Sequence, residues 1–235
     1  MSLTDLRREY RWGGLDRRDL LTDPTAQFED WFRQASSAKS GSWWRKVGIA
    51  LYKCFQTALG AEPIDPNAMT LATADQDGRP SARTVLLKGV DQRGFIFYTN
   101  YESRKGCELA ENPRGALVFY WADLERQVCV SGDIAKLPGA ESERYFSSRP
   151  RGSRLAAWAS NQSQVVADRA ALEEKWQQME AKFPGEDVPL PPDWGGYVLT
   201  PTRVEFWQGR PNRLHDRFRY TKQPEGHWTI ERLCP

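Results

Sequence analysis

The sequence predicts an α+β fold, a mostly antiparallel β-barrel decorated with helices. From Met69 onward, short segments rich in β-branched and aromatic residues are separated by turn signals such as QDG and DQRG. Few segments show the apolar spacing of helices, and no segment repeats another. At 235 residues the chain is long enough for one large domain, which we expect to cover 23–235 behind an N-terminal arm, 1–22.

The elements before Met69 are the arm and two helical segments. Residues 1–22 are charged and irregular. Residues 23–39 are expected to form an amphipathic helix with Phe28, Trp31 and Phe32 on one side. The apolar residues of segment 40–63, SGSWWRKVGIALYKCFQTALGAEP, also repeat at helical spacing. This segment predicts an extra amphipathic helix, which either docks on the protein's own surface or contacts a membrane or a partner.

The rest of the chain is predicted to alternate strands with a few helices. We expect strands at 69–75, 81–90, 95–100, 115–123, 126–137, 197–209, 213–221 and 227–233. We expect helices at 103–112, 138–150 and 168–183, the second of them stopped by Pro150. Residues 188–196 form an extended connector.

Composition argues against several function classes. The net charge of +2 disfavours wholesale nucleic-acid binding. The four cysteines are scattered without a CxxC pair, so we expect a reducing compartment and no metal centre. The N-terminus has no apolar signal segment, and no stretch is long and apolar enough to span a membrane. The sequence therefore predicts a soluble, cytoplasmic protein.

The segment FWQGRPNRLHDRF, residues 206–218, contains one of only two histidines. If it is a strand, Arg213, His215 and Arg217 share one face, while Leu214 and Phe218 point toward a core. Groups that carry or can gain positive charge repel each other on one face unless an anion lies there. The segment therefore indicates either a ligand with acidic groups or a solvated barrel face with carboxylates nearby.

The motif NYESRKG, residues 100–106, predicts a phosphate site at the start of a helix. Ser103 is a good N-cap, and Arg104 and Lys105 occupy the first turn, where positive charge opposes the helix dipole. An anion at this end would use both the cations and the free backbone N–H groups. The alternative is a solvated helix end.

Other motifs place polar groups where a phosphorylated or heterocyclic ligand would need them. In RTVLLK, the odd separation of Arg83 and Lys88 puts them on opposite faces of a strand, where they would serve two different anions. In RYFSSRPRGS, Tyr145 and Arg149 share a helix face and Ser153 follows, which suits a phosphate monoester or else a capped helix end. The side chains that would suit a flat heterocycle are Gln127, Gln162 and Ser163.

Taken together, these motifs resemble the pyridoxamine 5′-phosphate oxidase family. The motifs occur in fixed order: RTVLLK, FYTNYESRKG, ERQV, YFSSRPRGS, NQS and EFWQGRPNRLHDRF. The resemblance runs from Leu6 to Pro235, apart from segment 40–63. It implies a homodimer of FMN-binding split barrels with two equivalent active sites at the subunit interface.

The resemblance also implies a role for each matching residue. The residues implied for FMN are Arg83, Thr84, Val85, Leu86, Leu87, Lys88, Tyr98, Thr99, Arg104, Lys105, Gln127, Gln162, Ser163, Trp207 and Arg217. The residues implied for the substrate are Arg7, Tyr10, Lys88, Tyr145, Arg149, Ser153, Arg213 and His215. Of these, Arg213 and His215 are the expected catalytic residues.

The implied reaction oxidises pyridoxamine or pyridoxine 5′-phosphate to pyridoxal 5′-phosphate, with dioxygen as acceptor and hydrogen peroxide as product. Two alternatives are a split-barrel flavin reductase and a non-enzymatic binder of pyridoxal phosphate or another phosphorylated metabolite. A flavin reductase would need no second phosphate site, and a simple binder would need no residues for the flavin. The chain departs from the family pattern at Arg154, Ala156 and Cys234, where Gln, Gly and Ala are usual.

Overall fold

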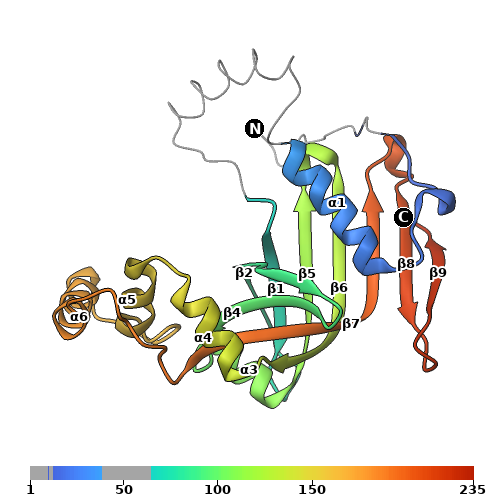
Figure 1. The fold of residues 1–235 in the computed structure, drawn as a ribbon. Helices are drawn as coiled ribbons and strands as arrows, with labels where there is room; N and C mark the ends of the chain where they lie inside the picture. The colour runs from blue at the N-terminus through green and yellow to red at the C-terminus, as the bar shows by residue number, and fades with distance from the viewer. Residues whose placement is uncertain (1–9, 11–12, 39–64) are drawn as a thin grey trace, which may run out of the picture. The chain divides into compact units, whose positions relative to one another are not determined.

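The computed structural model describes residues 10, 13–38 and 65–235, and it divides the chain into two compact units (Figure 1). Unit 1 comprises the described residues up to Thr70 together with Leu117–Ser131 and Pro201–Pro235. Unit 2 comprises Leu71–Ala116 and Gly132–Thr200. The expected helix at 40–63 and the arm residue Arg7 lie outside the described residues. The prediction of one domain over 23–235 stays a prediction.

The strands pair as the antiparallel prediction requires. Their bounds are β1 Ala68–Ala74, β2 Pro80–Leu86, β3 Gly89–Asp91, β4 Gly94–Asn100, β5 Arg114–Trp121, β6 Arg126–Lys136, β7 Trp194–Gln208, β8 Asp216–Lys222 and β9 Trp228–Leu233. They are hydrogen-bonded in the order β2-β1-β5-β6-β7-β4-β3, with β8 on β7 and β9 on β8. The α+β, antiparallel prediction is confirmed.

In unit 1, helix α1, Pro24–Ala38, packs its predicted apolar side on the strands. The ring of Phe28 lies 4.8 Å from that of Phe119 in β5, and Trp31 meets Phe206 of β7 edge-on at 5.1 Å. Both helix side chains are buried, and so is Phe218 of β8. Burial of this aromatic side explains why 24–38 forms a helix here.

Unit 2 contains four helices among the residues described: α3 Arg104–Glu111, α4 Gly139–Ser147, α5 Arg151–Ala159 and α6 Arg169–Lys182. Helix α5 was not predicted from the sequence, because Pro150 was interpreted only as the stop of the preceding helix. The structure places Pro150 at the N-cap of α5. Proline disrupts a helix interior but is well tolerated at a helix start. Pro150 therefore both ends the helical segment that contains α4 and begins α5.

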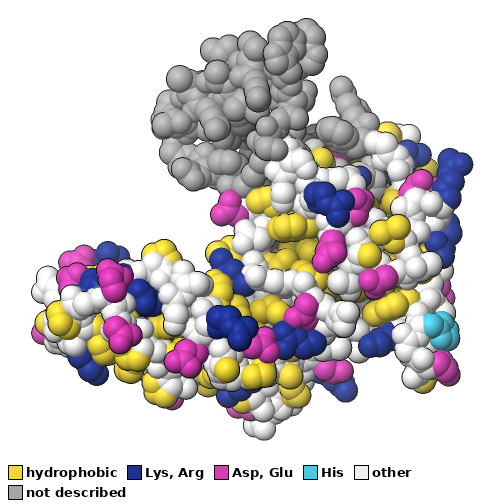
Figure 2. All heavy atoms as spheres, in the orientation of Figure 1, with side chains coloured by type: hydrophobic (Ala, Val, Ile, Leu, Met, Phe, Trp, Pro, Cys, Tyr) yellow, Lys and Arg dark blue, Asp and Glu magenta, His cyan; other side chains and the backbone are white. Residues whose placement is uncertain are grey.

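Two surface properties bear on function. No helix within the described ranges is long and apolar enough to cross a membrane. On the face in Figure 2, Lys and Arg side chains are interspersed with Asp and Glu. That mixture agrees with the near-neutral net charge and does not favour nucleic-acid binding.

Candidate functional site

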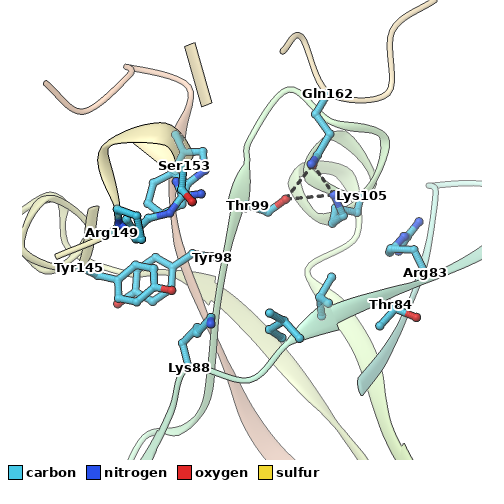
Figure 3. A pocket seen from close by; sticks show the side chains of 14 residues that line it. Arg83, Thr84, Lys88, Tyr98, Thr99, Lys105, Tyr145, Arg149, Ser153 and Gln162 are labelled. Atoms are coloured by element: carbon cyan, nitrogen blue, oxygen red, sulfur yellow. Dashed lines mark hydrogen bonds between the residues drawn. The ribbon is translucent and has the colours of Figure 1, made fainter. Parts of the chain in front are cut away.

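A pocket of about 550 Å³ in unit 2 brings together most of the residues predicted to bind ligands (Figure 3). Its walls come from β2, β4, the first turn of α3, the region where α4 gives way to α5, and the start of β7. The lining residues are Arg83, Thr84, Val85, Leu86, Lys88, Tyr98, Thr99, Lys105, Tyr145, Arg149, Pro150, Ser153, Gln162 and Trp194. The predicted residue Leu87 is buried and is not among them.

The start of α3 forms one side of the pocket, and Ser103 is its N-cap as predicted, accepting from the backbone N–H of Gly106. The buried ammonium of Lys105 donates to Thr99 Oγ1 at 3.0 Å and to Gln162 Oε1 at 2.6 Å. Burial, helped by the charge of Arg83, lowers the pKa of Lys105 to about 8. A cation held in this way gains from an anion that enters the pocket.

Arg83 and Lys88 were predicted to lie on opposite faces of one strand, but Lys88 lies beyond the end of that strand, and both residues line this pocket. Strand β2 ends at Leu86 and β3 begins at Gly89, so the chain leaves the strand before Lys88. Side-chain alternation holds only within a continuous strand.

On the other side of the pocket, the rings of Tyr98, Tyr145 and Trp194 stack. The Tyr98 and Tyr145 centroids are 3.9 Å apart at an interplanar angle of 16°, and Trp194 stacks on Tyr98 at 5.6 Å. Gly196 faces Tyr98 in the β4–β7 pairing, where a Cβ atom would lie 2.7 Å from the tyrosine ring. The glycine therefore leaves the space that the stack needs.

Arg149 lies against this stack, with its guanidinium carbon 4.7 Å from the ring centre of Trp194. Helix α4 ends at Ser147, so Tyr145 and Arg149 do not share a helix face as predicted, although both line the pocket. Nη1 of Arg149 is buried without a hydrogen-bond partner among the described residues. Burial lowers the pKa of this guanidinium. An unpaired buried donor of this kind is costly unless a ligand accepts from it.

Two residues predicted for the cofactor lie just outside the lining set. The side chain of Arg104 is exposed and pairs with Glu108, with Nε 2.8 Å from the carboxylate. Ser163 follows the lining residue Gln162 and has a left-handed backbone, with φ of 74°.

The remaining predicted residues belong to unit 1. There the rings of Tyr10, Trp207 and His215 cluster, with centroids 4.7 to 5.5 Å apart. His215 Nδ1 accepts a hydrogen bond from the backbone N–H of Arg210 at 3.1 Å.

The prediction that Arg213, His215 and Arg217 share one strand face is wrong. Residues Pro211–Arg213 form a 3₁₀ turn, and β8 begins only at Asp216. Arg213 has a left-handed φ of 62°, after Asn212 at 59°. Proline and asparagine favour such a turn, which breaks the alternation of the strand. Leu214, predicted to face a core, is 70% exposed.

Arg217 lies in β8 and is held firmly. Its Nε donates to Glu205 at 2.8 Å, its Nη1 donates to the carbonyl of Cys234 at 2.9 Å, and Trp207 pairs with it across β7 and β8. The hydrogen bond to Glu205 raises its pKa. Nearby in unit 1, Gln127 donates to the thiol of Cys129, whose pKa burial raises to about 11.

Three residues in or beside the pocket were not predicted from the sequence: Trp194, Glu108 and Pro150. Trp194 was placed in an extended connector, although it starts β7. Glu108 follows Arg104 by four residues on one helix, a spacing that could have marked it as an ion-pair partner. Pro150 was treated only as a helix stop.

Comparison with known proteins shows the family to which the chain belongs. The family model described as pyridoxamine 5′-phosphate oxidase matches residues 56–183. The model described as pyridoxine 5′-phosphate oxidase C-terminal dimerisation region matches residues 194–235. The chain belongs to the pyridoxamine 5′-phosphate oxidase family. The resemblance predicted from the motifs is thereby confirmed.

Relatives in this family match along the whole chain. A pyridoxine/pyridoxamine 5′-phosphate oxidase from Paraburkholderia phymatum is 51% identical, covering 100% of this chain and 99% of its own. One with the same name from Salinibacter ruber is 53% identical over 99% of both chains.

Solved structures agree on the fold. PhzG from Burkholderia lata, in complex with tetrahydrophenazine-1-carboxylic acid, is 30% identical with a TM-score of 0.78 and covers 93% of this chain and 95% of its own. A pyridoxamine 5′-phosphate oxidase-related FMN-binding protein from Nostoc punctiforme is 19% identical with a TM-score of 0.60, covering 83% and 99%. The second likeness supports the split-barrel fold alone.

Proposed function

We infer that this protein oxidises pyridoxine and pyridoxamine 5′-phosphates to pyridoxal 5′-phosphate, with FMN as its cofactor and dioxygen as electron acceptor. The relatives that match the whole chain at about half identity carry the name of this activity. The observation that carries the proposal is the presence in one pocket of two separate groups of side chains that carry ammonium, guanidinium and hydroxyl donors.

The two groups lie on opposite sides of the pocket in Figure 3. One contains Lys105, Thr99 and Gln162 with Arg83, and the other contains Lys88, Tyr145, Arg149 and Ser153. Ammonium, guanidinium and hydroxyl groups are the donors that phosphate oxygens prefer. Two phosphates in one pocket suit a phosphorylated cofactor beside a phosphorylated substrate.

The residues present fit FMN. Lys105 is a buried cation at the N-terminus of α3, where backbone N–H groups also point outward. We propose that Lys105, Arg83 and Arg104 hold its phosphate and that residues 84–88 with Tyr98 and Thr99 hold its ribityl chain. When bound, FMN would supply the redox chemistry, a two-electron oxidation of the substrate with dioxygen as final acceptor and hydrogen peroxide as product.

The protein's part on the substrate side is orientation. We propose that Lys88, Tyr145, Arg149 and Ser153 hold the substrate phosphate, with the unpaired Nη1 of Arg149 donating to it. Fixing the phosphate also fixes the ring and its reacting carbon. Holding the reacting atoms in a near-attack geometry supplies much of the rate in such reactions.

Roles in the reaction are also proposed for residues of unit 1. We propose that Gln127, Trp207 and Arg217, with Gln162 and Ser163, contact the flavin ring, and that Arg213 and His215 hold the substrate ring and stabilise its developing charge. Arg7 and Tyr10 would cover the substrate. We further propose a homodimer with its two active sites at the interface, in keeping with a family region described by dimerisation.

The test is to purify the protein, measure its flavin content, and add pyridoxine 5′-phosphate anaerobically. We expect a yellow protein whose absorbance near the flavin maximum bleaches with substrate and returns with oxygen. A yellow protein that does not bleach would favour the flavin reductase alternative. A colourless protein that binds pyridoxal phosphate but not FMN would favour the non-enzymatic binder.

We also propose a cytoplasmic location. Three cysteines in the described part of the chain, Cys107, Cys129 and Cys234, are free thiols, which suits a reducing compartment.

A further inference from the structure

We propose that Glu108 is a positioning residue that orients Arg83 and Arg104 toward the phosphate of FMN. The proposal rests on the assignment of the unit 2 pocket to FMN, and it adds a carboxylate to a site otherwise made of cations.

Glu108 lies on α3, one turn after Arg104, and is buried although it is charged. Its Oε2 accepts from the hydroxyls of Thr73 and Ser81 and from Nη2 of Arg83 at 3.3 Å. Its Oε1 accepts from Nε of Arg104 at 2.8 Å. One carboxylate therefore joins two strands and both arginines.

The ionised form of this carboxylate is stable in its buried position. Burial alone would raise the pKa of Glu108, but hydrogen bonds from Ser81, Thr73 and the two arginines lower it to about 2. A buried carboxylate with its acceptor sites filled by charged and hydroxyl donors keeps its partners in one geometry.

The geometry leaves donors available for a ligand. Glu108 binds Arg104 through Nε, and the terminal nitrogens of Arg104 donate no hydrogen bond to a described residue. Arg83 is fixed through its terminal nitrogens, Nη1 to Thr73 and the carbonyl of Leu71, and Nη2 to Ser81 and Glu108. These bonds use its four terminal N–H groups and leave Nε–H as its donor for a ligand, while the side chain lines the pocket. Held this way, neither guanidinium has to find its orientation when a phosphate arrives.

Charge alone predicts the opposite effect. A phosphate monoester carries about 1.5 to 2 negative charges near neutral pH, so a carboxylate close to it repels it. If Glu108 acted only through its charge, removing that charge would tighten FMN binding. If it positions the arginines, removing it weakens binding. The sign of the change therefore separates the two roles.

The experiment titrates the apoprotein with FMN and with riboflavin, following the quenching of flavin fluorescence, for wild type, Glu108→Gln and Glu111→Gln. Glu111→Gln is the matched control, because it removes the same charge from a residue one turn further along α3. The carboxylate of Glu111 is exposed, and it accepts a hydrogen bond from a backbone N–H at 3.4 Å. We expect Glu108→Gln to raise the Kd of FMN about tenfold or more, the loss expected when a charged hydrogen bond is weakened. Riboflavin, which lacks the phosphate, should bind both variants about as it binds wild type.

Three results would overturn the proposal. The first is that Glu108→Gln binds FMN as tightly as wild type or more tightly. The second is that it loses FMN and riboflavin equally, which a purely structural role predicts. The third is that Glu111→Gln weakens FMN binding as much as Glu108→Gln. Wild type that binds no FMN would instead refute the proposed function itself.

Ser81→Ala keeps the proposal testable if Glu108→Gln does not fold. It removes one hydroxyl that contacts both Glu108 and Arg83 and leaves every charge in place. We expect a smaller loss, about threefold in FMN affinity and none for riboflavin, as for one neutral hydrogen bond. Unchanged FMN affinity in a folded Ser81→Ala protein would count against the positioning role.

Discussion

The unit 2 pocket and the unit 1 segment around Arg213 hold their cations in opposite ways. In the pocket, Lys105 donates to Thr99, Ser103 and Gln162, and Arg83 is bonded to three side chains. Arg213 is exposed and makes no hydrogen bond or ion pair with a described residue. The pocket is thus organised before a ligand arrives, whereas Arg213 is available for one. We infer that pocket residues set binding and that Arg213 sets turnover.

The largest effect expected from this contrast is that of Arg213→Ala. We expect kcat/KM to fall about 100-fold to 1000-fold, as when a group that stabilises developing charge is removed, while FMN content stays the same. Steady-state kinetics with flavin quantification checks this. Arg203→Ala, an exposed arginine on β7, is the control and should leave both unchanged. Equal loss of flavin and activity in Arg213→Ala would show a structural role.

A substitution in the pocket should change binding instead. Arg149→Ala removes the donor whose Nη1 lacks a partner, so we expect the KM for pyridoxine 5′-phosphate to rise about tenfold to 100-fold with FMN content unchanged. Arg144→Ala, an exposed arginine on the same α4 segment, should leave the KM at its wild-type value. A fall in kcat at constant KM would contradict the division between the two regions.

The pH dependence of FMN binding tests Lys105. Its pKa of about 8 lies below the ordinary value, so the ammonium is lost as pH rises through 8. A phosphate favours the ammonium, so FMN affinity should be full below that pH and fall about tenfold between pH 7 and 10. Fluorescence titration should show this step for FMN but not for riboflavin. In Lys105→Met, FMN binding should be weak and the step should disappear; a step that persists would assign it to another group.

The smallest expected effect concerns the turn before β8. Asn212 has a φ of 59°, a conformation that glycine adopts freely and alanine does not. Asn212→Gly should keep kcat/KM within about twofold, whereas Asn212→Ala should lower the free energy of unfolding by about 1 kcal/mol. Chemical denaturation and kinetics of both variants check this. If the two variants have the same kcat/KM and the same free energy of unfolding, the left-handed turn does not determine the position of Arg213.

In both regions, the sequence predicted residues on regular elements better than residues in the turns between them. Residues on regular elements were predicted well. The N-cap at Ser103 has a local signature, and the position of Phe28 and Trp31 on the buried side of α1 follows from helical spacing. Predictions failed where a short turn interrupts alternation. Lys88 lies after the end of β2, and Arg213 lies in a 3₁₀ turn, so strand periodicity does not apply to either residue. Local patterns do not encode where a strand ends when the stop depends on tertiary contacts.

Contacts between residues far apart along the chain also could not be predicted from the sequence. Glu108 meets Thr73 and Ser81, which are 35 and 27 residues away along the chain. Trp194 stacks on Tyr98 only because β7 pairs with β4. The family motifs indicated which residues belong together, but the packing that orients them comes from the fold.

The most direct test of the two-region site is a mixed dimer that carries Arg149→Ala in one protomer and Arg213→Ala in the other. The two chains, with different affinity tags, are co-expressed, and the dimer with both tags is assayed at substrate well below KM. If each site takes its pocket from one protomer and Arg213 from the partner, one site of the mixed dimer carries both changes and the other carries neither. We then expect about half of wild-type activity per dimer. Activity no higher than that of the two parent variants would show that both residues act within a single chain.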